Sequence, residues 1–532
     1  MPGRTKVHSF SKLEPVVIRD AEPADFERAV CASGYGKFNI ILYCISTAAG
    51  WSSVFETTAM SYVFPAAECD LQLTLNHKGL LNAVTYAGMI SSAFIWGFLC
   101  DTLGRKKLLT IGLLLDGLFL MMAALSQNFQ LLMIAKFLGG FIINGPFAAL
   151  TAYLSEFHCA KQRARVQMIL GAIFSLGNLI LPLLALIILP FNIKLKLGSL
   201  EFHSWNIYLM VSSLPAIASG VAFIFLPESP KFLMTIGDNK KALQVFKKVY
   251  HVNTGYPEET YPIKYLVDEV NNFDINLTPN DVTTIKTNKQ MLKEGFHQIK
   301  PIFLPPHVTK IVLVFLLQFM IMMGLNTLRL WLPQIYQAMN DYQYYNNKSA
   351  TLCETLEIFQ PKTEIFNTTV STCQINSNNT EVYTNSMIVA TTSIIGYITA
   401  GTLINSLGKK TLLGILGFIS GSMAMMLYFS ENVASTIAFS AMFVTFGSIG
   451  INVILAVVVD LTPTSLRIGM CTTVFLRRIC DDWLCFLGIL PSKYGYESIA
   501  IRNLYLNKIN LNQKFYMVII SNITYWLICK SL

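Results

Sequence analysis

Charged residues are scarce in this chain. Asp, Glu, Lys and Arg make up 13% of its 532 residues, whereas hydrophobic residues make up 53%. A soluble domain carries about 25% charged residues, so the composition excludes an ordinary water-soluble fold. The net charge is +9, but the basic residues gather in loops between apolar runs. That distribution is typical of the inner loops of membrane proteins, and it does not indicate nucleic-acid binding.

The chain also lacks the motifs of common enzyme sites. It has no Cys/His spacing suited to a metal and no phosphate loop of the Gly-Lys-Ser type, and Ser155-Glu156 does not fit a nucleophile elbow. We therefore expect no enzyme, no catalytic residue, no cofactor and no metal site. A short signal peptide is not visible either, because the N-terminus through Lys37 is polar and mixed in charge.

What the chain has in abundance is long apolar runs, each near the length of about 20 residues that a helix needs to cross a bilayer. They predict an all-α integral membrane protein with twelve spans, at roughly 38–64, 79–100, 108–125, 131–154, 166–191, 205–226, 308–335, 387–407, 412–429, 434–459, 470–490 and 515–528.

The spans divide the chain into four parts. We expect a cytoplasmic N-terminal tail at 1–37, a six-helix half at 38–226, a central cytoplasmic loop at 227–306 and a second six-helix half at 307–532. Within the central loop, Asn239 to Tyr250 predicts a short amphipathic helix. Both termini then lie in the cytoplasm, and the membrane is either the plasma membrane or a vesicle membrane.

One large polar loop, 340–384, is expected on the outer side. It holds three glycosylation sequons, at Asn347, Asn367 and Asn378. Cys353 and Cys373 flank its middle and can pair in an oxidising compartment, although sequence does not show their geometry.

A basic turn between two spans occurs twice. Gly97, Asp101, Gly104 and Arg105 belong to a segment that ends at Lys107, and Gly401, Gly408 and Lys409 match it at one constant offset. The same offset places Glu156 and Arg163 over Asp460 and Arg467. Two motifs related by one shift indicate two homologous halves.

The residue types suit a tight turn that can form a latch. Gly97 allows close helix approach, and Gly104 permits a sharp turn. Asp101 at a helix end can pair with a basic residue or accept free amides, while Arg105 keeps the loop inside. The alternative is an ordinary basic inner turn.

These motifs, together with Pro227-Glu228-Ser229-Pro230, resemble the signatures of the major facilitator superfamily, in its sugar-porter and organic-ion branch. Finer features resemble the synaptic vesicle glycoprotein 2 family: Pro65 to Asp70, Ser155-Glu156-Phe157 and Phe202 to Trp205. The resemblance covers about residues 38–490. It implies the major facilitator fold, with two pseudo-symmetric halves, and inter-helix ion pairs at a gate for Glu156, Arg163, Asp460 and Arg467.

Polar residues inside the spans are the candidates for substrate or proton contact. Glu56 is a lone acid in the first span and suits proton coupling or cation binding, or else a structural bond to a neighbouring helix. Ser53 stands where the resembled family has a second acid. Lys136 occupies the position of a family Arg, for substrate contact or structural pairing.

Two later spans add three candidates. Asn326 and Arg329 lie in the seventh span, where Pro333 can break the helix and Arg329 can instead snorkel outward. Arg478 lies in the eleventh span, which lines the path in the resembled superfamily. It either binds an anionic group or forms a helical pair with a nearby Asp.

The sequence thus predicts a transporter of a small organic solute (a sugar, an organic cation or an organic anion) that works by alternating access in the lipid bilayer. Coupling to protons through Glu56 is a hypothesis. The alternative is a non-transporting vesicle-membrane glycoprotein that acts in docking or regulation, with the helical core as a scaffold.

Overall fold

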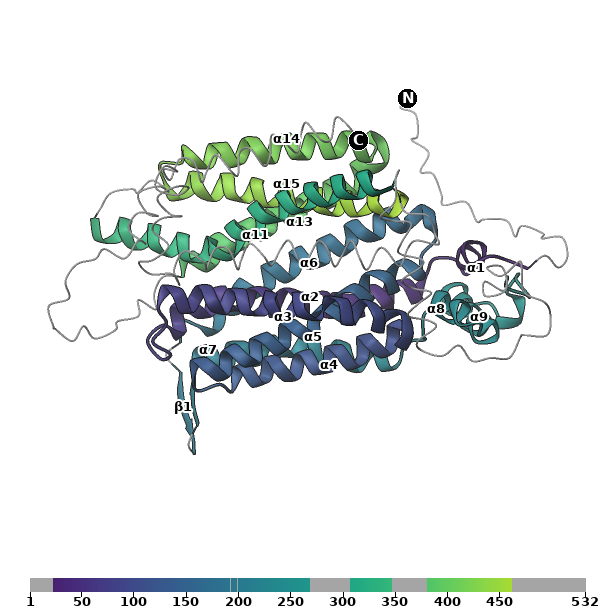
Figure 1. The fold of residues 1–532 in the computed structure, drawn as a ribbon, viewed down its shortest axis with the longest axis horizontal. Coiled ribbons are helices and arrows are strands. Elements are labelled where there is room, and N and C mark those ends of the chain that lie inside the picture. Colours follow the sequence, from purple (N-terminus) through teal and green to yellow (C-terminus); the bar gives the residue numbers. More distant parts are fainter. Residues whose placement is uncertain (1–22, 192, 199, 268–306, 347–379, 462–532) are drawn as a thin grey trace, which may run out of the picture.

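A computed structural model of the chain describes residues 23–191, 193–198, 200–267, 307–346 and 380–461 (Figure 1). Long helices dominate it. The first six are α2 (Lys37–Ala67), α3 (Leu75–Leu103), α4 (Arg105–Ala124), α5 (Phe129–Glu156), α6 (Ala160–Ile188) and α7 (Ser204–Ile224). The later ones are α11 (His307–Asn346), α13 (Glu381–Leu407), α14 (Lys409–Tyr428) and α15 (Val433–Leu461).

Eight of the described helices are long and apolar enough to cross a membrane, namely α2, α4, α5, α6, α7, α13, α14 and α15. Helices α3 and α11, of 29 and 40 residues, run alongside them (Figure 1). The predicted all-α membrane architecture is therefore observed. The predicted eleventh and twelfth spans lie outside the described residues.

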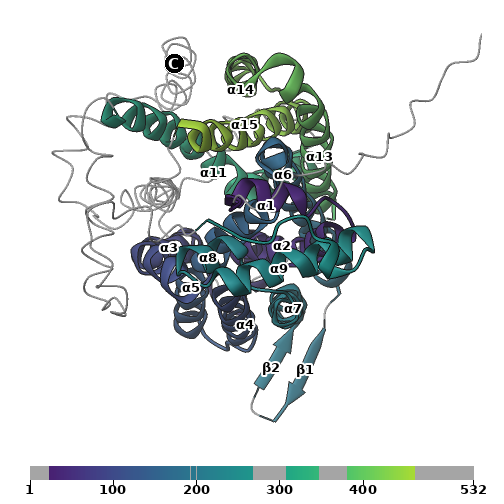
Figure 2. The same ribbon diagram turned by 90° about the vertical axis from the view of Figure 1, so that its right-hand side faces the viewer.

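The helices form two layers that follow chain order (Figures 1 and 2). In the first layer α3 packs on α5, α4 on α5 and α7, and α2 on α6 and α7. In the second, α15 packs on α11, α13 and α14. Contacts of α6 with α13 and α15, and of α2 with α11, join the layers. This is the arrangement expected of two helical halves.

Prolines do not interrupt two of the long helices. The first span is predicted to end at 64, before Pro65, but α2 continues to Ala67. Pro333 can break the seventh span, but α11 runs unbroken through it to Asn346. A proline removes one backbone N–H from a helix, and neighbouring helices in a membrane bundle compensate for the loss. Helix α11 consequently extends into the loop predicted at 340–384.

A small bundle of short helices lies at one end of the long helices (Figures 1 and 2). It consists of α1 (Phe26–Ala32), α8 (Pro230–Thr235), α9 (Asn239–Thr254) and the turn η1 (Glu258–Thr260). Phe26, Met234 and Phe246 form part of its core. Helix α9 confirms the amphipathic helix predicted from Asn239. Helix α1 forms within the segment that was expected to be only a tail.

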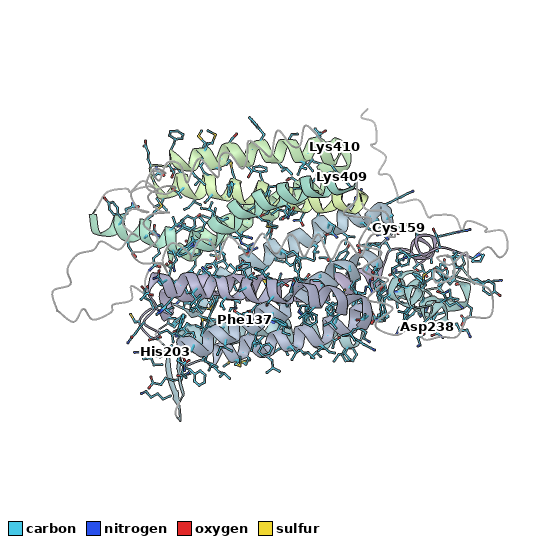
Figure 3. All side chains as sticks on the ribbon, in the orientation of Figure 1. Phe137, Cys159, His203, Asp238, Lys409 and Lys410 are labelled. Atoms are coloured by element: carbon cyan, nitrogen blue, oxygen red, sulfur yellow. A yellow bond between two sulfur atoms is a disulfide. The ribbon has the colours of Figure 1, made fainter. Side chains whose placement is uncertain are left out.

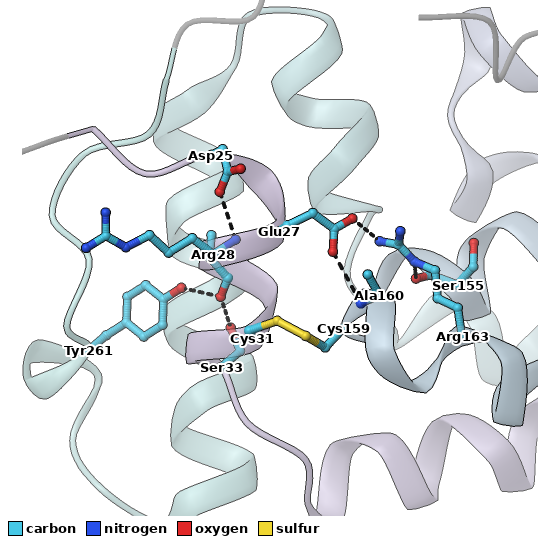
Figure 4. The surroundings of a disulfide bond; sticks show 11 residues. Asp25, Glu27, Arg28, Cys31, Ser33, Ser155, Cys159, Ala160, Arg163 and Tyr261 are labelled. Carbon is cyan, nitrogen blue, oxygen red and sulfur yellow. Dashed lines mark hydrogen bonds and ion pairs between the residues drawn. A yellow bond between two sulfur atoms is a disulfide. The ribbon is translucent and has the colours of Figure 1, made fainter. Parts of the chain in front are cut away.

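A disulfide fastens this bundle to the long helices (Figure 4). Cys31 of α1 bonds to Cys159, which lies in the turn between α5 and α6. Beside it, Glu27 accepts the Ala160 N–H at 3.3 Å and pairs with Arg163. The disulfide predicted between Cys353 and Cys373, and the sequons at Asn347, Asn367 and Asn378, lie outside the described residues.

At the other end, a polar hairpin joins α2 to α3. Glu68 pairs with Lys78 at 2.8 Å, and Asp70 accepts the Trp205 indole N–H at 3.0 Å. Beside it, strands β1 (Lys194–Leu197) and β2 (Leu200–His203) form an antiparallel ribbon. Two segments that resemble the synaptic vesicle glycoprotein 2 family therefore meet through Asp70 and Trp205.

Glycines set the spacing between α3 and α5. A Cβ atom on Gly140 would lie 2.0 Å from the Thr85 carbonyl oxygen, and one on Gly88 would lie 2.2 Å from that of Phe137. Both obstacles are backbone atoms, which cannot rotate away. Close helix approach through small residues is a common packing mode in membranes, where apolar side chains gain little from leaving lipid.

Gly140→Ala should therefore destabilise the fold, by roughly 3 kcal/mol or more, because the added methyl forces α3 and α5 apart. The measurement is thermal unfolding of the full chain in detergent. Gly414→Ala is the matched control, since a Cβ there has nothing within 4 Å. Equal melting temperatures for the two variants would contradict the prediction.

Candidate functional site

A buried ion pair joins the first and fourth long helices of the first half. Lys136 Nζ of α5 lies 2.7 Å from Glu56 Oε1 of α2 and also donates to the Glu56 backbone carbonyl at 2.6 Å. The exposed fractions of the two side chains are 1% and 0%. Sequence reasoning selected each residue separately, and the structure brings them together.

The backbone of α5 makes room for this pair. A Cβ on Gly139 would lie 2.4 Å from Glu56 Oε1, so the carboxylate occupies the space of a missing side chain. The second carboxylate oxygen of Glu56 has no hydrogen-bond partner among the described residues, and neither has the buried Ser53 hydroxyl. One oxygen of Glu56 is therefore held by Lys136, while the other is available for a proton or a donor.

Besides Glu56 and Lys136, a third charged residue lies deep within the helices of this half, and sequence reasoning missed it. Asp116, in the middle of α4, is fully buried, and neither of its carboxylate oxygens has a hydrogen-bond partner among the described residues. The signal was present, because Asp116 is a lone acid within the apolar run Leu108–Leu125. The rule that singled out Glu56 applies equally to it.

The second half contributes candidates from α11. Asn326 is buried and points its amide toward the sulfur of Met322 at 3.8 Å. Arg329 is half-buried, its Nε lacks a hydrogen-bond partner among the described residues, and its helix α11 packs on α2 of the other half. Arg329 therefore lies where the two halves meet. Arg478 lies outside the described residues.

The repeated turn has the same backbone geometry in both halves. Gly104 joins α3 to α4 with φ 89° and ψ 155°, and Gly408 joins α13 to α14 with φ 76° and ψ 156°. Both values of φ belong to a region that L side chains rarely adopt, which accounts for glycine at each turn. Figure 3 places Lys409 and Lys410 at the same end of the bundle as Cys159, with His203 at the opposite end.

Side chains at this end tie three elements together. Arg105 Nε of α4 lies 3.4 Å from Glu156 Oε1 of α5, and the Ser229 hydroxyl donates to the other Glu156 oxygen. The Arg105 guanidinium also stacks over the Phe232 ring at 5.3 Å. Nearby, Glu228 accepts the Lys106 backbone N–H at 2.9 Å. Glu156 thus forms an inter-element ion pair at a helix end.

The structure describes contacts for some of the remaining motif residues but not for all of them. Arg163 pairs with Glu27 of α1 and donates to the Ser155 carbonyl at 3.2 Å. Gly97 lies within α3, and Gly401 of α13 faces Met168 of α6, where a Cβ would lie 3.7 Å from its side chain. The side chains of Asp101 and Asp460, and all of Arg467, lie outside the described part of the chain.

His158 lies in the turn between α5 and α6, just outside the spans. Its Nδ1 lies 2.7 Å from the Leu154 carbonyl and its Nε2 lies 3.2 Å from Asn39 Nδ2. Burial lowers the pKa of this imidazole below its ordinary value of 6.5. The neutral ring fits these partners, because Nδ1–H donates to the carbonyl and Nε2 accepts from the amide.

Comparison with known proteins gives a family. A family model described as the Major Facilitator Superfamily matches residues 46–352. Synaptic vesicle glycoprotein 2B of Rattus norvegicus is 31% identical over 246 residues, which are 45% of this chain and 36% of that protein. Synaptic vesicle glycoprotein 2A of Rattus norvegicus is 28% identical over 253 residues, 47% of this chain and 34% of that protein. The matched region is thus a minority of each relative's length.

Solved structures share the fold. A partially occluded, inward-open form of the E. coli xylose transporter XylE matches with a TM-score of 0.59 at 12% identity, over 93% of this chain and 99% of that one. The proton:xylose symporter XylE bound to 6-bromo-6-deoxy-D-glucose matches with a TM-score of 0.58 at 14% identity, over 93% of this chain and 94% of that one. At this identity the likeness shows the fold alone.

Lys136→Met should lower the free energy of unfolding by about 3–5 kcal/mol, because it leaves Glu56 as an unpaired buried charge. The double variant Glu56→Gln with Lys136→Met should recover most of the loss. Thermal unfolding in detergent measures both. Lys196→Met, which breaks the exposed Lys196–Glu201 pair, is the control and should change nothing measurable. A double variant as unstable as the single one would contradict the prediction.

The stability of the wild type should fall as the pH falls below about 6.5. The folded-state pKa of His158 lies below that ordinary value, so the unfolded chain binds the proton more readily. The stability that neutral His158 contributes is present above pH 6.5 and is lost as pH falls through the lowered pKa. Melting temperature against pH measures this. His158→Gln should flatten the curve in that window, and an unchanged slope would refute the assignment.

Proposed function

The chain belongs to the major facilitator superfamily, and from that premise we propose that it transports a small organic solute by alternating access. The two six-helix halves, 38–226 and 307–532, would rock about a central site between them. The substrate class is a sugar, an organic cation or an organic anion. The chain acts as a multi-pass protein of the plasma membrane or a vesicle membrane, with its termini in the cytoplasm.

The buried pair Glu56–Lys136 is the observation that carries the proposal. Charged groups inside a bilayer are costly, and in transporters they mark substrate or proton pathways. Here Glu56 offers an oxygen with no partner among the described residues. Asn326 and Arg329 of α11 offer polar groups from the other half. The titles of the matched XylE structures name a xylose transporter and a proton:xylose symporter, which supports a solute site coupled to protons.

The network at the inner end supports a gate. Arg105, Glu156 and Ser229 join α4, α5 and the start of α8 through contacts between half-buried side chains. Such contacts can form in one conformation and break in another at modest cost. We assign Gly97, Asp101, Gly104, Arg105, Glu156 and Arg163 to this gate. By the repeat, Gly401, Gly408, Lys409, Asp460 and Arg467 form its counterpart.

Uptake into proteoliposomes tests the proposal. Labelled hexoses, organic cations and organic anions are offered with and without an inward proton gradient. We expect saturable uptake of one class that the gradient stimulates, and we expect Glu56→Gln to lose that stimulation because the oxygen that takes the proton is gone. Glu201→Gln, on the exposed ribbon, is the matched control and should behave as the wild type.

Three results would change the conclusion. Gradient-stimulated uptake that persists in Glu56→Gln would exclude Glu56 as the coupling residue. Saturable uptake that ignores the gradient would show a facilitator. Folded wild-type protein that takes up none of the probes would overturn the transport proposal and favour a docking or regulatory glycoprotein, which the similarity to synaptic vesicle glycoproteins 2A and 2B would then explain.

A further inference from the structure

We infer that Asp116 is a second proton-binding carboxyl of this chain, and that it shares the Lys136 ammonium with Glu56 in alternation. The inference deepens the proposed function and rests on it for the part played in transport. The binding of a proton by Asp116 can be tested without any solute.

The register of α4 against α5 places Asp116 beside the ion pair. Gly112 of α4 meets Pro146 of α5, where a Cβ would lie 2.4 Å from the Pro146 side chain. Two turns further along α4, Leu120 belongs to the same buried cluster as Ala135 of α5. Asp116 lies midway between Gly112 and Leu120 on the same helix face. Since the two helices run in opposite directions, Asp116 comes level with residues 140–142 of α5, within one turn of Gly139.

Gly139 is the position that the Glu56 carboxylate fills. Its missing side chain leaves the space into which Glu56 Oε1 fits, and Lys136 lies one turn away on α5. Asp116, Glu56 and Lys136 also lie within electrostatic range of one another. Three helices, α2, α4 and α5, therefore bring two carboxyls and one ammonium to a single buried cluster.

Apart from Asp116, Glu56 and Lys136, the charged residues of α4 and of the helices that pack on it lie near helix ends within the described chain. Helix α7, which also packs on α4, has no Asp, Glu, Lys, Arg or His between Ser204 and Ile224. Helix α3 carries His77, Lys78 and Asp101 near its two ends, with Tyr86 and Cys100 also within it. No second cation within the described residues of these helices is placed to neutralise Asp116.

Charge balance then requires one proton. With both carboxyls ionised, the cluster has a net charge of −1, and Asp116 would be an ionised carboxylate without a donor inside the membrane. One proton from water, bound as an O–H bond on Asp116, makes the cluster neutral. Lys136 directs two N–H groups at Glu56, so in this conformation the proton belongs to Asp116.

A movement of the Lys136 ammonium from Glu56 to Asp116 would reverse the roles. When the ammonium turns from Glu56 to Asp116, Asp116 releases its proton and Glu56 becomes the carboxyl without a cation. Glu56 then takes up one proton, and the total charge is unchanged. The cluster holds one proton in either arrangement, and the choice of carboxyl follows the position of one lysine. Release to opposite sides of the membrane would couple this exchange to the rocking of the halves.

Infrared difference spectroscopy of the full chain in lipid nanodiscs tests the inference. The carboxylic-acid C=O band is followed as the pH is changed, with no solute present. We expect the wild type to keep such a band at pH values where exposed carboxyls are ionised. Asp116→Asn should lose it, and Glu56→Gln should lose it too, because Lys136 then turns to Asp116, which ionises. Asp25→Asn, at the exposed N-cap of α1, should match the wild type.

Asp116→Glu keeps a carboxyl at this position and is the control for misfolding of Asp116→Asn. It should keep the acid band at a shifted frequency, because the proton then sits on a glutamic acid. A band that persists unshifted in Asp116→Glu, or that remains in Asp116→Asn, would overturn the inference. Because no solute is used, absent uptake would refute the proposed function and leave this result standing, and the converse also holds.

Discussion

The cost of placing charge in a membrane interior is the constraint on which this structure depends. A carboxylate and an ammonium without partners would be intolerable there, so Glu56 and Lys136 must meet, and α2 and α5 must approach each other at one depth. Gly139 supplies the space for the carboxylate. The pair therefore fixes the relative position of two helices that apolar contacts alone would leave free to slide.

Glycines also allow close helix packing at positions away from the Glu56–Lys136 pair. Gly88 and Gly140 bring α3 against α5, and Gly112 brings α4 against Pro146 of α5. Helix α5 thus becomes the centre of the first half, with α2, α3 and α4 packed around it. The C-terminal end of α5 carries Glu156, which binds Arg105 and Ser229. A change at the buried pair and a change at the proposed gate would act on the same helix.

Much of this could be predicted from local sequence. Apolar runs give the spans, because each must match the bilayer thickness, and the two basic turns give the repeat, because Gly104 and Gly408 need the same unusual backbone. The long-range partners of individual side chains were not predictable from local sequence. Arg163 pairs with Glu27, and Cys31 bonds to Cys159, across sequence separations that no local pattern encodes.

The prolines and Asp116 show two different reasons for failure. Ending the first span before Pro65 and allowing a break at Pro333 both assume the effect that proline has in water, but the surrounding helices of a membrane bundle keep α2 and α11 continuous. Asp116 was overlooked although its isolation in an apolar run marked it as clearly as Glu56. Its meaning depends on the helix register that brings it within one turn of Gly139, which only the folded structure provides.

The buried cluster also bears on the choice between a transporter and a scaffold. Replacing a buried ion pair by apolar residues of similar volume is often neutral or stabilising, so stability alone does not explain why a helical scaffold would hold one. Asp116 strengthens this argument, since a fully buried carboxyl without a hydrogen-bond partner among the described residues can only weaken a purely structural core. Buried charged groups lower the stability of a single fixed conformation, but they can act when they exchange partners or protons. Alternating access provides such exchanges. The electrostatics of the first half therefore favour a working transporter.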